Sequence, residues 1–209
     1  MGFAGAAPGQ SEIFHTLIMR GGVAEYPKIW FLRHGQTVWN AERRIQGRLN
    51  SDLTELGKAQ ALMQRRLMAP FVDDVVKGGG GLYVSPQGRA QQTAELALEG
   101  RVCTVDERLA EINSGLWEGR TRDEVAPQGA DLEVYAAAPE GEGYEALEAR
   151  VRDFLNDLTA PAIVVSHGIL GKVLRGVILD LPRKQVSDLS NLQGCVYVLE
   201  NGFETVLHS

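Results

Sequence analysis

Short apolar runs alternate with segments of helical periodicity along this 209-residue chain, and this alternation is the feature that most constrains its fold. The apolar runs, each of strand length, cover residues 28–32, 82–84, 102–105, 162–165, 195–199 and 203–207. The last two flank Asn201-Gly202, a dipeptide typical of two-residue hairpins. Strands that alternate with helices form a mainly parallel sheet covered by helices on both faces. We therefore predict an α/β fold, a three-layer α/β/α sandwich with a mainly parallel central sheet.

The helical segments carry start and stop signals of their own. Thr54 is a predicted N-cap for a helix that ends at Ala69, before a proline. Ser85 is predicted to cap a helix that has Pro86 at its first position and runs to about Leu98. Further helices are expected at 144–158 and 169–179. A short helix is expected after Thr121, where Thr121 and Glu124 have capping-box spacing.

The length of the chain fits one domain, because a domain usually has about 150 residues. We expect residues 28–209 to form this domain, 1–27 to be an N-terminal extension and about 112–143 to form a lid over one end of the sheet. No apolar run reaches the roughly 18 residues of a membrane span, and the first residues lack the pattern of a signal peptide. The two cysteines, in apolar runs far apart, are expected to be buried and reduced. These features favour a cytoplasmic protein without a membrane partner.

Charge is unevenly distributed along the chain. The totals are 27 acidic and 21 basic side chains, a net −6, and this balance argues against a nucleic-acid partner. Residues 107–148 hold 11 of the acids and only 3 basic residues, whereas residues 33–48 hold four arginines and one glutamate. We interpret the net charge as an average over a basic pocket and an acidic cover. The cover is expected to disfavour highly charged substrates.

Three predicted strands are followed directly by cationic or titratable side chains. His34-Gly35 follows the first strand, His167-Gly168 follows the strand at 162–165, and Arg89 lies just after the strand at 82–84. Ligands of open parallel sheets bind beyond the carboxyl ends of the strands. Two imidazoles and two guanidiniums, the second from Arg33, should therefore meet at one edge of the sheet. Arginine forks at such an edge are suited to a phosphate.

These residues stand in an ordered series of motifs. The series runs through Arg33-His34-Gly35-Gln36-Thr37-Val38-Trp39-Asn40, Gln46-Gly47, Leu53-Thr54-Glu55-Leu56-Gly57, Ser85-Pro86-Gln87-Gly88-Arg89-Ala90, Leu109-Ala110-Glu111, Gly115-Leu116-Trp117-Glu118-Gly119 and Ser166-His167-Gly168. It resembles the histidine phosphatase superfamily, the phosphoglycerate-mutase-like enzymes. The resemblance covers about residues 28–200.

The resemblance implies a role for each matching residue. His34 would be the nucleophile that accepts the phosphoryl group, and Glu111 would donate a proton to the leaving group. His167 would be the third catalytic residue, beside the phosphate oxygens. The substrate phosphate would be bound by residues of the same motifs, namely Arg33, Arg89, Asn40, Thr37, Gln46, Gly47 and Gly168. Because water would hydrolyse the phosphohistidine, no metal or other cofactor is expected.

Within this family the chain resembles the phosphatases more than the cofactor-dependent mutases. Those mutases carry His-Tyr-Gly after the acidic residue and a basic insertion, whereas here Ile112-Asn113-Ser114-Gly115 follows Glu111 and the insertion is acidic. We therefore expect a phosphomonoesterase that acts on a small-molecule phosphate ester. A phosphoglycerate mutase and a non-catalytic phosphate-binding scaffold are the alternatives. The sequence leaves the identity of the ester open, and also whether the chain is a monomer or a homodimer.

Overall fold

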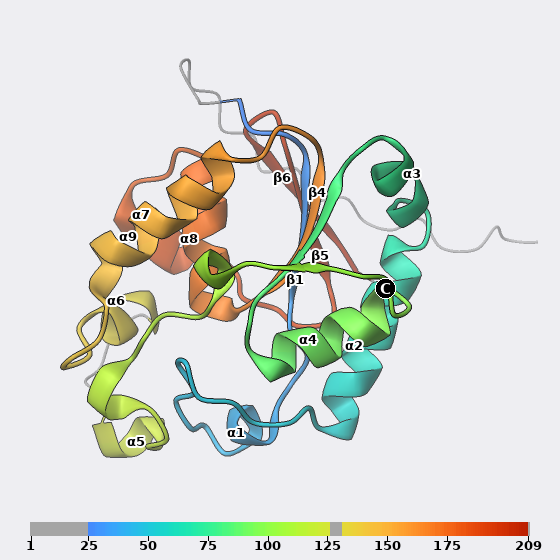
Figure 1. Cartoon of the computed structure of the whole chain (residues 1–209). Coiled ribbons are helices and arrows are strands. Elements are labelled where there is room, and N and C mark those ends of the chain that lie inside the picture. Colours follow the sequence, from blue (N-terminus) through green and yellow to red (C-terminus); the bar gives the residue numbers. More distant parts are fainter. Residues whose placement is uncertain (1–24, 126–130, 209) are drawn as a thin grey trace, which may run out of the picture.

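A computed structural model describes residues 25–125 and 131–208 (Figure 1). Most of the predicted extension, residues 1–24, lies outside the described residues. The strands are β1 (Ile29–Arg33), β2 (Gly81–Val84), β3 (Thr104–Val105), β4 (Ala162–Ser166), β5 (Val196–Glu200) and β6 (Phe203–Leu207). The α-helices are α1 (Val38–Ala41), α2 (Glu55–Met68), α3 (Val72–Lys77), α4 (Gly88–Ala97), α5 (Arg122–Val125), α6 (Asp131–Ala136), α7 (Gly143–Asn156), α8 (Gly168–Ile178) and α9 (Arg183–Asp188). Two 3₁₀ helices, η1 (Glu107–Leu109) and η2 (Gly115–Trp117), precede α5.

The six strands form one mixed sheet in the order β3-β2-β4-β1-β5-β6. Strands β1, β2, β3 and β4 are parallel to their neighbours within this group, and β5 and β6 are antiparallel additions at one side. The predicted hairpin at Asn201-Gly202 is confirmed, since both residues have positive φ between β5 and β6. The mainly parallel α/β fold is therefore confirmed.

The side chains of the central strands alternate between two hydrophobic cores. In β1, Ile29 and Phe31 pack in the core under α7 and α8, whereas Trp30 and Leu32 pack in the core under α2, α3 and α4. The period of two in a strand sends successive side chains to opposite faces of the sheet. Because both faces are covered, the central strands are apolar throughout and read as continuous apolar runs. Figure 1 shows the resulting layers, with α7, α8 and α9 on one side of the sheet and α2, α3 and α4 on the other.

The structure corrects several local predictions. Ser85 is not a helix cap: α4 begins at Gly88 with Gln87 as N-cap residue, because the Ser85 hydroxyl is engaged in a tertiary contact described below. The strand predicted at 102–105 comprises only Thr104–Val105, and Val102 is 94% exposed. Cys195 is buried as predicted, but Cys103 is only half-buried. The short helix α3 was not predicted, since six residues give too little periodicity.

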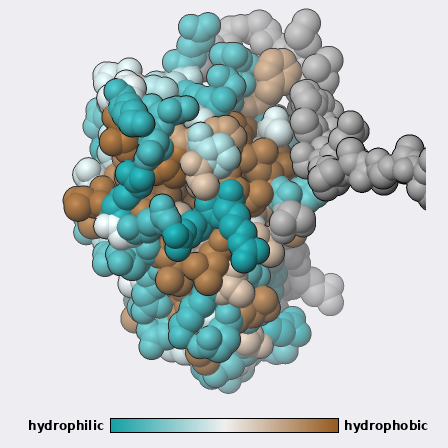
Figure 2. Space-filling model, turned by 90° about the vertical axis from the view of Figure 1, so that its right-hand side faces the viewer, coloured by the Kyte–Doolittle hydropathy of each residue, from teal (hydrophilic) through white to brown (hydrophobic). Residues whose placement is uncertain are grey.

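Figure 2 views the molecule from the side of α2 and α3, where apolar residues are interleaved with polar ones. The exposed apolar residues of these helices and of the edge strand β3 include Leu56, Leu62, Val76 and Val105. Among the described residues, no helix is both long enough and apolar enough to cross a membrane.

The packing of α8 on β1 generates a prediction about stability. A Cβ atom added at Gly171 would lie 2.4 Å from the ring of Phe31, which is itself fully buried. We expect Gly171→Ala to lower the free energy of unfolding by about 1–3 kcal/mol, the usual cost of overpacking a core. Chemical denaturation would measure it. In the double variant Gly171→Ala/Phe31→Leu, the loss of stability should be smaller than the sum of the losses in the two single variants. A loss equal to that sum would contradict the packing argument.

Candidate active site

The parallel pairing of β1 with β4 brings the two histidines together. Arg33 and Ser166 are register partners at the carboxyl ends of these strands, and the His34 N–H donates to the Ser166 carbonyl at 2.9 Å. The ring centroids of His34 and His167 are consequently 5.2 Å apart, edge to face. Both side chains are buried.

His34 presents a nitrogen without a proton. Its Nδ1 lies 2.7 Å from the Gly35 carbonyl oxygen, which can only accept, so Nδ1 carries the proton. Burial, together with the positive charges of Arg89 and Arg33, holds the pKa of His34 well below its ordinary value of 6.5. The ring is therefore neutral near pH 7, and Nε2 keeps its lone pair. The Nε–H of Arg89 donates to this nitrogen at 3.3 Å.

His167 has the complementary arrangement. The Ser85 hydroxyl donates to the Gln87 side-chain oxygen at 2.8 Å, so Ser85 accepts a proton from His167 Nε2, which lies 2.6 Å away. Nδ1 is then the nitrogen without a proton, and it is buried with no hydrogen-bond partner among the described residues. Burial and the charge of Arg89 hold the pKa of His167 well below 6.5 as well. As an acceptor this nitrogen lacks a donor, and it could bind an anionic oxygen only after the ring takes up a proton.

The two predicted arginines near His34 differ in the hydrogen bonds that their guanidiniums make. The terminal nitrogens of Arg89 donate to the carbonyls of Leu49 (2.6 Å) and Gly47 (2.9 Å), and burial lowers the pKa of Arg89 to about 10. Each terminal nitrogen of the Arg89 guanidinium thus donates one N–H to a loop carbonyl and keeps a second N–H free. Arg33 donates from Nη1 to the Asn191 carbonyl, while its Nε is buried without a partner in the described part of the chain. Burial lowers the pKa of Arg33 too, against the opposing charge of Glu111.

The Glu111 carboxylate lies at the N-terminus of α8. One oxygen accepts from the N–H groups of Leu170 (2.9 Å) and Ile112 (3.0 Å), and the other accepts from Ile169 at 3.1 Å. The positive end of a helix dipole favours a negative charge at this place. Glu111 also lines the same cavity as His34.

Two of the predicted glycines lie where neighbouring side chains come so close to the backbone that no Cβ atom would fit. A Cβ atom at Gly168 would lie 2.6 Å from the Asn191 amide and 3.2 Å from Arg33 Nε. Gly47 has a φ of +49°, and a Cβ atom there would lie 2.0 Å from the Glu118 carboxylate. Gly47 therefore places its carbonyl against Arg89, and Gln46 beside it lines the cavity with its side-chain oxygen unpaired among the described residues.

Thr37 and Asn40 form a capping box at α1. The Thr37 hydroxyl accepts from the Asn40 N–H, and the Asn40 side-chain oxygen accepts from the Thr37 N–H, both at 3.1 Å. Asn40 lines the cavity, but Thr37 is fully buried and is not one of the lining residues. The contribution of Thr37 in this structure is thus to orient Asn40.

Comparison with known proteins shows the family of the chain. Residues 29–205 match the model of the histidine phosphatase superfamily (branch 1). The chain belongs to the histidine phosphatase superfamily. Over 170 residues it is 34% identical to the probable phosphoglycerate mutase GpmB of Yersinia pestis, covering 74% of this chain and 76% of that protein.

Solved structures of similar fold come from several bacteria. YhfR of Bacillus stearothermophilus is 27% identical, with a TM-score of 0.69 over 88% of this chain and 96% of that one. A candidate α-ribazole-5′-phosphate phosphatase of Escherichia coli is 24% identical, with a TM-score of 0.68 over 88% of this chain and 96% of its own. At this identity the second likeness supports the fold alone.

The cavity of this histidine phosphatase is also lined by residues that the sequence did not predict. It encloses about 500 Å³, including the part open to solvent. Residues from five separate segments complete its lining beside the predicted ones, namely Arg44, Ile45, Ile112, Ser114, Asp131, Tyr135, Ile169 and Asn191. Of these residues, only Arg44 is one of the four arginines of the basic stretch 33–48 noted in the sequence. No local pattern marks the others, because only the tertiary fold brings their segments together.

Most acids of the predicted lid are engaged in contacts of their own. Glu133 pairs with Arg183, and Glu142 pairs with Arg150. Among the residues that line the cavity, the insertion contributes one acid beyond the predicted Glu111, namely Asp131, which also pairs with Arg122. The expected acidic cover is thus reduced at the cavity to one carboxylate. Glu118 accepts hydrogen bonds from the N–H groups of Arg48 and Ser114.

Metal ions in proteins are usually held by clusters of His, Cys, Asp and Glu side chains. Within residues 25–125 and 131–208, no three or more His, Cys, Asp or Glu side chains gather where they could hold a metal ion. That the reaction needs no metal stays a prediction, tested below.

The low pKa of both histidines predicts how stability depends on pH. Below pH 6.5 the unfolded chain binds protons on these rings while the folded protein does not, so the free energy of unfolding should fall as pH decreases. The slope should reach about 1.4 kcal/mol per pH unit for each ring. Urea denaturation in phosphate-free buffer between pH 7.5 and 5.5 would measure it. The His34→Asn/His167→Asn variant should have a distinctly flatter profile, and equal slopes would refute this assignment.

Proposed function

We propose that this protein is a phosphomonoesterase that hydrolyses a small phosphate ester through a phosphohistidine at His34, with water as the final acceptor. One observation carries the proposal. A buried imidazole with a proton-free Nε2 lies beside a second imidazole, 5.2 Å away, and a guanidinium. An in-line nucleophile among fixed positive charges is what phosphoryl transfer requires.

In the first step, the Nε2 lone pair of His34 would form a bond to phosphorus while the bond to the ester oxygen breaks. The partnerless groups of the site, Arg33 Nε and His167 Nδ1, are the proposed contacts of the phosphoryl oxygens. His167 would take up a proton when it binds the anion, because the negative charge raises its low pKa. Arg89 would stabilise the developing charge with its two free N–H groups.

Glu111 is the proposed proton donor to the departing alkoxide. For this role it must be protonated when the ester bond breaks, and its carboxylate then accepts a proton from the water that attacks the phosphohistidine. That second step releases inorganic phosphate and restores His34. The three N–H groups around Glu111 would stabilise the carboxylate between the two steps.

A phosphoglycerate mutase is the second candidate, and the 34% identity to a probable phosphoglycerate mutase favours it. Two features of this chain support hydrolysis instead. The sequence after Glu111 is Ile112-Asn113-Ser114, and the insertion contributes the Asp131 carboxylate to the cavity. A carboxylate there would repel the second phosphate of a bisphosphate intermediate.

The two candidates differ in their products. We expect release of inorganic phosphate from p-nitrophenyl phosphate in EDTA, and we expect at least a 1,000-fold loss in His34→Ala. Conversion of 3- to 2-phosphoglycerate, stimulated by the bisphosphate and faster than hydrolysis, would overturn the proposal in favour of the mutase. Binding of vanadate with neither activity would indicate a non-catalytic scaffold.

The proton-donor role has its own test. Glu111→Gln should reduce kcat/KM about 100-fold for an alkyl ester such as glycerol phosphate but less than 10-fold for p-nitrophenyl phosphate. The reason is that p-nitrophenolate leaves without a proton, whereas an alkoxide does not. Equal losses for both esters would remove Glu111 from this role.

Asp131 is expected to set part of the substrate preference. Asp131→Asn should raise kcat/KM about 3- to 10-fold for 3-phosphoglycerate relative to glycerol phosphate, because a like charge beside the bound ester is removed. Glu133→Gln is the matched control, since Glu133 lies on the same helix, pairs with Arg183 and does not line the cavity. The same change in both variants, or in neither, would show that Asp131 does not select against anionic leaving groups.

A further inference from the structure

Arg150 of α7 contacts the backbone of the segment that carries Glu111. Its Nη1 donates to the Arg108 carbonyl at 2.5 Å, and its Nη2 lies 3.2 Å from the Glu111 carbonyl. The remaining contacts, from Nε (3.2 Å) and again from Nη2 (2.6 Å), go to the Glu142 carboxylate. Among the described residues, every hydrogen bond of this guanidinium ends on Glu142 or on the segment 108–111.

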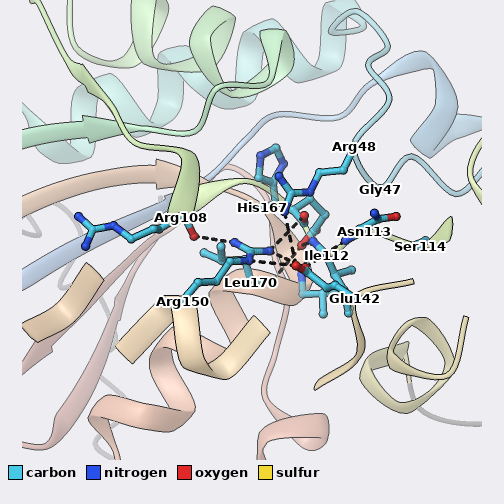
Figure 3. Close-up of polar contacts among 12 residues, drawn as sticks. Gly47, Arg48, Arg108, Ile112, Asn113, Ser114, Glu142, Arg150, His167 and Leu170 are labelled. Carbon is cyan, nitrogen blue, oxygen red and sulfur yellow. Dashed lines mark hydrogen bonds and ion pairs between the residues drawn. The ribbon is translucent and has the colours of Figure 1, made fainter. Parts of the chain in front are cut away.

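Glu142 extends this hold to the other side of Glu111. Its Oε1 accepts from the Asn113 N–H at 3.1 Å, and the Glu142 N–H donates to the Asn113 carbonyl, also at 3.1 Å. Figure 3 shows Arg150 and Glu142 side by side, with dashed contacts reaching toward Arg108 and Asn113. The backbone is thus fixed before, at and after Glu111. We call this pair, Arg150 and Glu142, the Glu111 clamp.

The clamp is shielded from water and lies next to the catalytic groups. Both side chains are only 15% exposed, so their mutual attraction is little screened. The charge of Arg150 also contributes to the low pKa of His167, after burial and the nearer cations. A contrasting pair lies two residues further along the same helix, where Arg152 and Glu148 are 2.6 Å apart and more exposed.

We infer that Arg150 is a positioning residue for the proton donor, acting through the backbone of residues 108–113 with Glu142. This inference rests on the role of Glu111 under the proposed function. Two parts of the structure fix the position of the Glu111 carboxylate. One is the N-terminus of α8, whose N–H groups bind it, and the other is the backbone of Glu111 itself. The clamp fixes the second part relative to α7, which itself packs on α8 in the same core. A displacement of about 1 Å in such a group costs roughly 100-fold in rate.

The position of a proton donor matters only where the leaving group needs a proton. A variant of Arg150 should therefore lose activity selectively on alkyl esters, whereas general damage to the fold or to the phosphate pocket would reduce activity on both ester types. The ratio of kcat/KM for p-nitrophenyl phosphate to that for glycerol phosphate is the readout that separates the two effects.

The test compares Arg150→Met and Glu142→Gln with Arg152→Met, the matched control on the same helix. We expect the ratio to rise about 10- to 100-fold in the first two variants and to stay unchanged in the control. Arg150→Lys should give an intermediate ratio, because one ammonium cannot reach both carbonyls and the carboxylate together. Thermal unfolding of each variant would show that it is folded at the assay temperature.

A double variant tests directly whether Arg150 acts through Glu111. In the Glu111→Gln background, Arg150→Met should not raise the ratio further, since the group that it positions is gone. If Glu111→Gln raises the ratio and neither Arg150→Met nor Glu142→Gln does, the clamp is only structural and this inference is wrong. If Glu111→Gln leaves the ratio unchanged, the proton-donor role itself fails, and the clamp fails with it.

Discussion

The site depends on one constraint, the parallel pairing of β1 and β4 in a register that ends at Arg33 and Ser166. Because both strands end at the same level, the residues that follow them, His34 and His167, leave the sheet side by side. A shift of one residue would turn every side chain of a strand to the opposite face and separate the rings. The register is fixed by two cores, since each strand buries alternate residues under different helices.

Burial gives the site its chemical character. Two imidazoles and two guanidiniums lie close together, so burial and each cation lower the pKa of the neighbouring histidines. The same arrangement leaves Arg33 Nε and His167 Nδ1 without partners among the described residues. Unpaired buried groups are unfavourable for stability. Groups of this kind are typical of functional sites, where some stability of the fold is given up for activity.

The pattern of strands and helices predicts only the parts of the site that follow a strand end, whereas Glu111, Asn40 and Gln46 were predicted from the family resemblance. His34, His167 and Arg89 could be placed together because each follows a recognisable apolar run, and a parallel sheet aligns the ends of such runs. Ser85 was misinterpreted for a related reason. Its position before Pro86 is typical of a helix cap, but the hydroxyl binds His167, and a contact across 82 residues leaves no trace in local sequence.

The net charge of the insertion did not predict how many of its carboxylates reach the cavity. Ion pairs with arginines of other elements engage several of its acids, and the pair of Arg150 with Glu142 ties the insertion to α7. What a charge does thus depends on its partner, which sequence patterns do not reveal. For the cavity, the consequence is that two carboxylates, Glu111 and Asp131, oppose three arginines along its lining. One phosphate dianion would then reverse the local balance from positive to negative, and a second anionic group on the substrate would meet repulsion rather than attraction.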